Sequence, residues 1–140
     1  MRLVFIFVLA AFLGCSASLP RLDPEGAMES GLSPGNAAYP RTTVTLPQAA
    51  DIRKVEIVPR EPLRRFQVWI RTPESKWEMV KEFNGRFNSA FTLKVGMEGD
   101  AVRVLNMKPH PNRFSKPHVS GVSGTIKNVL IYGYWLNGAL

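Results

Sequence analysis

Aromatic and basic side chains are the groups in this sequence that could bind a ligand. Trp69, one of three tryptophans, is the most informative of them. It interrupts an alternating apolar run formed by Phe66, Val68 and Ile70. Such a ring can stack on a sugar, since a pyranose presents C–H bonds to the negative face of the aromatic system. It could equally pack on the second face of a sheet, and the sequence leaves both interpretations open.

A basic segment, residues 107–119 (MKPHPNRFSKPHV), is the second candidate. An aromatic ring lies among its cations, which would suit an anionic sugar or a lipid headgroup, each exposed charge contributing modestly. The segment could instead be a solvated connection between strands. Its histidines match no zinc spacing, so no metal site is expected. The candidate ligand-binding residues are therefore Trp69, Lys108, His110, Arg113, Phe114 and Lys116.

Cys15 is the only cysteine, and it follows a run typical of an export leader. Arg2 supplies the positive start, and residues 3–13 are continuously apolar. This run is shorter than the roughly 20 apolar residues that a membrane-spanning helix needs. Its thiol is a nucleophile to which a lipid could be attached, and the small Gly14 precedes it. An ordinary leader with an incidental cysteine and an uncleaved anchor remain the alternatives.

The end of the leader, residues 12–15 (FLGC), resembles the lipobox of bacterial lipoproteins. In that family the leader is cut before the cysteine, whose sulfur takes a diacylglycerol and whose amine is acylated. The resemblance implies a signal peptide over residues 1–14, a lipid on Cys15 and attachment to a membrane of the bacterial cell envelope. Ser16 then points to the outer membrane. Residues 15–40 are rich in Gly, Pro, Ser and Ala and are expected to form a flexible tether.

The remainder, residues 41–140, shows the alternating pattern of an antiparallel β-sandwich. Seven short strands are expected at 42–46, 52–58, 66–70, 77–83, 91–95, 101–105 and 125–132, separated by Gly- and Pro-containing turns. Turns are expected at 47–51 and 96–100, among others. The predicted core is Val55, Ile57, Phe66, Val68, Ile70, Trp77, Val102, Val104 and Ile131.

The order of these segments resembles that of a discoidin-type domain, the coagulation factor C-terminal-type module of the galactose-binding-like superfamily. The matching segments read IRKVEI (52–57), FQV (66–68), KWEMV (76–80), AVRVL (101–105) and IKNVLIYG (126–133). The resemblance implies a jelly-roll sandwich that binds ligands through loops at one end, with Trp77 as its core tryptophan. The family's N-terminal strand and calcium loop have no counterpart here. A sandwich trimmed at that strand is therefore expected, without the calcium.

Together these features predict a membrane-anchored binding module for a glycan or another envelope component. The alternative is a structural lipoprotein that docks onto an envelope protein complex and binds no small ligand. No catalytic motif appears, so neither an enzyme nor a cofactor is expected. The formal net charge of +7 favours anionic surroundings. The export leader nevertheless argues against nucleic acid as a partner.

Overall fold

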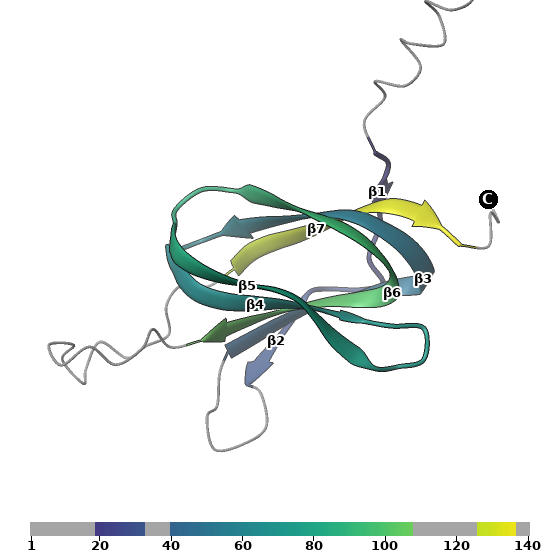
Figure 1. The fold of residues 1–140 in the computed structure, drawn as a ribbon, viewed down its shortest axis with the longest axis horizontal. Helices are drawn as coiled ribbons and strands as arrows, with labels where there is room; N and C mark the ends of the chain where they lie inside the picture. The colour runs from purple at the N-terminus through teal and green to yellow at the C-terminus, as the bar shows by residue number, and fades with distance from the viewer. Residues whose placement is uncertain (1–18, 33–39, 108–125, 137–140) are drawn as a thin grey trace, which may run out of the picture.

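Strands account for all of the regular structure in the described part of the chain. A computed structural model describes residues 19–32, 40–107 and 126–136, and no helix occurs in them. The strands are β1 (Arg21–Leu22), β2 (Glu29–Leu32), β3 (Pro40–Pro59), β4 (Leu63–Arg71), β5 (Trp77–Phe87), β6 (Phe91–Met107) and β7 (Ile126–Trp135) (Figure 1). They pair antiparallel throughout, in the order β1-β7-β3-β6-β4-β5, with β2 beside β3.

Two long strands, β3 and β6, form one ribbon that contributes to both layers of a β-sandwich (Figure 1). One part of the ribbon pairs Arg41 to Thr45 with Leu105 to Ala101, and the other pairs Ala50 to Ile57 with Gly99 to Phe91. Between them the register shifts, because residues 46–49 of β3 have no partner in β6. Such an irregularity bends a strand. We call the layer of β2, β3, β6, β4 and β5 the β4 layer, and that of β1, β7, β3 and β6 the β7 layer.

The apolar side chains of both layers meet in one hydrophobic cluster. Eight of the nine residues predicted for the core are buried, as period-2 alternation requires: Val55, Ile57, Phe66, Val68, Ile70, Val102, Val104 and Ile131. Phe66 has three further phenylalanine rings around it, with centroids 4.8 to 5.4 Å away. The prediction of a β-sandwich is therefore confirmed, with its core between the two layers.

The ninth residue, Trp77, was wrongly assigned to the core. Phe83 of β5 lies opposite the buried Phe66, but Met79 lies opposite the outward-facing Trp69. A register shift between these pairs leaves Val80 as an extra residue in β5. The extra residue reverses the parity of the strand, so that Trp77 and Met79 share the outer face with Glu82. Without the extra residue, Trp77 would share the inner face of β5 with Phe83.

The N-terminal region also differs from the expectation of a tether through residue 40. Arg21–Leu22 pairs with β7, and Glu29–Leu32 pairs with β3. Leu22 is 3% exposed and belongs to the core cluster. The folded part therefore begins well before residue 41. Strands this short carry little alternation, which is why composition alone suggested a linker.

The number of strands in the described residues equals the predicted seven only by coincidence, because their boundaries differ. Residues 47–51 and 96–100, predicted as turns, lie within the continuous strands β3 and β6. Each of these strands therefore replaces two predicted ones. The two N-terminal strands make up the difference. The Gly and Pro in these segments mark the bend of the ribbon and not a reversal of the chain.

Candidate functional site

The outer face of the β4 layer gathers aromatic and basic side chains from neighbouring strands. Phe66, Val68 and Ile70 of β4 point into the core. The intervening residues of the same strand therefore point outward. These outward residues are Arg65, Gln67, Trp69 and Arg71. Because β4 lies between β5 and β6, each outward residue has a neighbour on both sides, and the face is continuous.

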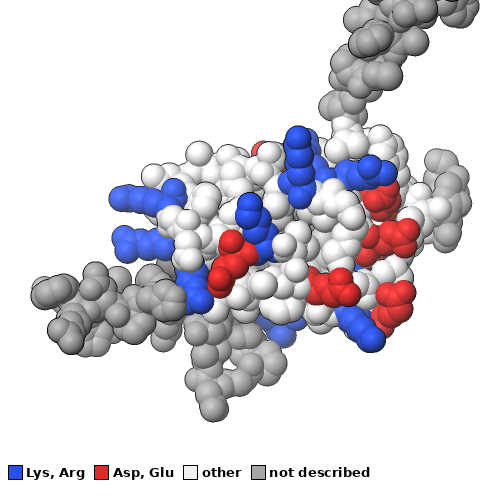
Figure 2. All heavy atoms as spheres, viewed as in Figure 1, with Lys and Arg blue, Asp and Glu red and all other residues white. Residues whose placement is uncertain are grey.

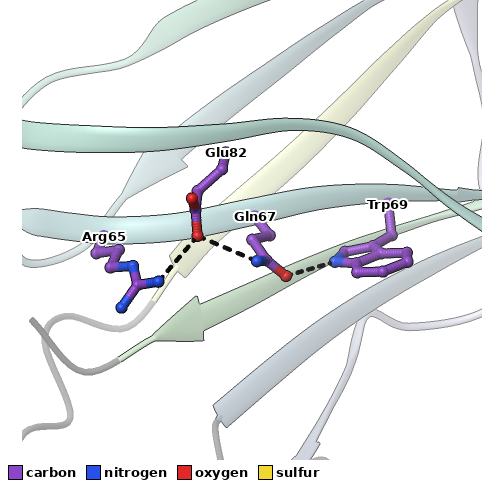
Figure 3. Close-up of polar contacts among 4 residues, drawn as sticks. All are labelled: Arg65, Gln67, Trp69 and Glu82. Atoms are coloured by element: carbon purple, nitrogen blue, oxygen red, sulfur yellow. Dashed lines mark hydrogen bonds and ion pairs between the residues drawn. The ribbon is translucent and has the colours of Figure 1, made fainter.

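Trp69 lies in the middle of this face, held by a chain of hydrogen bonds (Figure 3). Its indole N–H donates to Oε1 of Gln67 at 3.0 Å. The Gln67 amide donates to Oε1 of Glu82 at 3.1 Å, and Arg65 lies 3.2 Å from the same oxygen. The polar edge of the ring is thus satisfied within the protein. The indole is fixed in orientation, and the partly exposed ring can act as a rigid apolar surface.

Trp77 forms the second aromatic element of the face, and two arginines pack against it. The guanidinium carbon of Arg103 lies 4.0 Å from the ring centroid, and that of Arg71 lies 5.7 Å away. These distances are in the range of cation–π contacts. Arg71 also donates to Oδ1 of Asp100 at 2.7 Å, and Nε of Arg103 donates to the Thr43 hydroxyl at 3.0 Å. Trp77, assigned to the core from sequence, is therefore part of this surface.

Of the predicted ligand-binding residues, only Trp69 lies in the described part of the chain. Lys108, His110, Arg113, Phe114 and Lys116 lie outside it, as does Cys15. Trp69 pairs with Arg103, four residues along β6 from Met107. At about 3.3 Å per residue this is roughly 13 Å from the start of the basic segment. Trp69 thus lies on the side of the sandwich. The resemblance instead predicted a ligand site in the loops at one end of the sandwich, away from Trp69.

Sequence reasoning missed the rest of this face. Arg103 alternates with the core residues Val102 and Val104, so it points outward, but nothing in its local sequence linked it to Trp77. The two residues belong to β6 and β5, which are separated by β4. Arg103 reaches Trp77 across that strand, a contact that depends on the order of strands. The bulge in β5 that turns Trp77 outward has no signal in the apolar pattern.

On the face drawn in Figure 2, most Asp and Glu side chains lie toward the right, whereas Lys and Arg side chains are spread from the left end across to the right. In the described ranges, no group of three or more His, Cys, Asp or Glu side chains could hold a metal ion. Within the same residues there is no helix with the length and apolarity needed to cross a membrane.

The sequence matches no protein-family profile and none of the curated proteins. The fold, in contrast, is similar to that of solved carbohydrate-binding modules. The family 32 module of Clostridium perfringens NanJ, in complex with galactose, has a TM-score of 0.54 and 14% identity, covering 70% of this chain and 69% of that one.

Two further modules show the same likeness. CpGH89CBM32-4 of Clostridium perfringens, in complex with GlcNAc-α-1,4-galactose, has a TM-score of 0.58 and 12% identity, covering 83% and 95% of the two chains. The CBM32 of AlyQ, in complex with 4,5-unsaturated mannuronic acid, has a TM-score of 0.56 and 12% identity, covering 81% and 98%. The chain therefore has the antiparallel β-sandwich that its sequence predicted, with a fold similar to that of these modules.

Proposed function

We propose that this chain is an exported, non-catalytic module that binds a glycan of the bacterial cell envelope and is anchored there by a lipid on Cys15. The observation that carries glycan binding is Trp69, a ring fixed by Gln67 and partly exposed on the outer face of a sheet. The fold supports the same function, because the similar modules bind galactose, GlcNAc-α-1,4-galactose and a mannuronic acid in their own structures. A rigid aromatic surface binds with little loss of side-chain entropy.

Replacing Trp69 with alanine is expected to weaken glycan binding by about tenfold or more, the size of one lost aromatic contact of about 1.5 kcal/mol. The chain from residue 15 onward, carrying Cys15→Ser, would be applied to a glycan array, and hits would be quantified by calorimetry. Trp69→Phe keeps a ring and should retain part of the affinity. Tyr134→Ala removes an exposed ring from β7 and serves as the matched control. Equal affinity of Trp69→Ala and wild type would exclude this face as the site.

Anchoring through Cys15 would hold the sandwich close to the membrane. Leu19, the first described residue, follows Cys15 by four residues, a span of at most about 14 Å. The chain enters the fold beside the end of β7, where the N–H of Gly133 donates to the carbonyl of Pro20 at 3.1 Å. Tyr134 and Leu136, 51% and 40% exposed, lie in the same stretch. This end would face the lipid, since tyrosine favours the membrane–water interface.

Cys15→Ser is expected to abolish incorporation of radiolabelled palmitate and to leave the uncleaved precursor in the cell. The reason is that lipid transfer requires the thiol, and cleavage follows lipid transfer in the lipoproteins that this leader resembles. Fractionation of the wild type should place the labelled protein in the outer membrane. Release of an unlabelled wild-type protein as a soluble form would contradict the lipid anchor.

A second candidate function is docking onto an envelope protein complex without a small ligand. The exposed Tyr134 and Leu136 favour it, because neighbouring exposed apolar side chains often belong to protein interfaces. If the protein docks in this way, the variants Tyr134→Ala and Leu136→Ala should co-purify with less of the envelope partners than the wild type does. Trp69→Ala should co-purify with as much as the wild type. Wild-type protein that binds no glycan would favour this second function.

A further inference from the structure

Three arginines from three strands lie close together on the face that carries Trp69. Arg41 belongs to β3, Arg71 to β4 and Arg103 to β6. Arg103 is central among them. Burial lowers its pKa, and repulsion from Arg41 and Arg71 lowers the pKa further, while Glu29 raises it. The guanidinium remains charged, because arginine is effectively always protonated in proteins. This part of the face is therefore a local concentration of positive charge.

The protein's own carboxylates compensate this charge only in part. Arg71 forms an ion pair with Asp100 at 2.7 Å. Arg103 instead has the hydroxyl of Thr43 at 3.0 Å and the ring of Trp77 at 4.0 Å, neither of which is charged. Within residues 19–32, 40–107 and 126–136, no carboxylate oxygen lies within 4.0 Å of Arg103 or Arg41. A half-buried cation is stabilised by an anion that shares its environment.

The position of Arg103 relative to Trp69 suits a charged sugar. The two residues are direct partners on adjacent antiparallel strands, so their Cα atoms lie about 4.5–5.5 Å apart. That separation is about the size of one pyranose ring. A guanidinium group presents a planar fork of donors that matches the two oxygens of a carboxylate. The guanidinium carbon of Arg103 lies over the ring of Trp77, 4.0 Å from its centroid, which supports the group from one side.

We propose that this face binds an acidic saccharide, with a sugar ring packed on Trp69 and its carboxylate paired with Arg103. The inference rests on the proposed glycan-binding function and adds the chemical class of the ligand. Arg41 and Arg71 raise the local positive potential, and Thr43 fixes the guanidinium of Arg103 in place. Trp77 supports that guanidinium from the β5 side. Neutral sugars can still contact Trp69, but they carry no carboxylate to form an ion pair with Arg103.

Calorimetric titration with oligogalacturonate and with galactose tests the proposal, using the chain from residue 15 onward with Cys15→Ser. Wild type should bind oligogalacturonate more tightly than galactose, and the difference should shrink with added salt. Arg103→Gln should weaken oligogalacturonate binding by about tenfold, the loss of one charge-assisted pair, and leave galactose binding within about twofold. Arg103→Lys keeps the charge but not the fork, so it should recover only part of the affinity.

The matched control is Arg53→Gln, which removes one exposed charge that is paired with Asp51 on β3. It should leave both affinities unchanged. Equal losses from Arg53→Gln and Arg103→Gln would show a response to net charge alone and would overturn the proposal. Tighter wild-type binding of galactose than of oligogalacturonate would also overturn it, while the glycan-binding function would stand. Binding of no glycan at all, on an array as well as in these titrations, would remove both. Thermal melts of each variant establish that the fold is retained.

Discussion

Replacing Phe66 with alanine is expected to lower the free energy of unfolding by about 3–5 kcal/mol, the range for truncating a large buried aromatic residue. Phe66 is 0% exposed and stacks on Phe83, with ring centroids 4.8 Å apart. Phe87 and Phe91 contact it at 5.3 and 5.4 Å. These rings come from β4, β5 and β6, so removing Phe66 opens a cavity where three strands meet. Urea unfolding followed by circular dichroism would measure the loss.

Met79→Ala is the control for this prediction. Met79 is a large apolar residue of the same layer, but it is 49% exposed on the outer face. Its replacement should change the unfolding free energy by no more than about 0.5 kcal/mol, as is usual for surface positions. Similar losses for the two variants would mean that the phenylalanine rings do not form the centre of the core.

Gly133→Ala is expected to destabilise the fold by about 2–3 kcal/mol, the upper part of the range for overpacking. A Cβ atom at this position would overlap the carbonyl oxygen of Asp51 and lie 3.2 Å from the amide nitrogen of Arg53. Gly133 pairs with Ile52, beside the register shift that leaves Arg53 as an extra residue in β3. Backbone atoms cannot rotate away as a side chain can, so the two strands must separate. Thermal unfolding would report the change.

Gly96→Ala tests whether the effect is specific. A Cβ atom added at Gly96 of β6 would meet no atom within 4 Å. Alanine there reduces the entropy of the unfolded chain and should be neutral or stabilising by up to about 1 kcal/mol. If Gly96→Ala lowered stability as much as Gly133→Ala, then loss of glycine flexibility would explain both variants and the close approach of β7 to β3 would not.

The point at which the folded domain begins could not be predicted from the local sequence. A fragment starting at residue 41, the predicted beginning of the sandwich, would seem sufficient from composition. It would lack β1 and β2, and with them the buried Leu22. Two-residue strands such as β1 form only because β7 already presents a row of backbone groups for pairing. Isolated pairs of this length have no stability of their own.

The sequence by itself determined the class of fold and most of the core. Every second residue of a strand points to the same face, as backbone geometry requires. The apolar residues at alternate positions are Phe66, Val68 and Ile70 in one strand and Val102 and Val104 in another. Those positions are buried as predicted. The outward orientation of Trp69 could also be predicted. Trp69 lies between the core residues Val68 and Ile70, so its side chain points to the opposite face of the strand.

Only the tertiary structure decided which residues accompany Trp69. The extra residue Val80 turns Trp77 outward, and the order of strands brings Arg103 across β4 to Trp77. A bulge reverses the face to which the following side chains of a strand point, but it leaves the order of apolar and polar residues in the sequence unchanged. The apolar pattern therefore does not reveal it. Contacts between strands far apart in sequence depend on pairing register, which the period-2 pattern restricts but does not specify. The arginine and tryptophan side chains of this face are therefore brought together by topology.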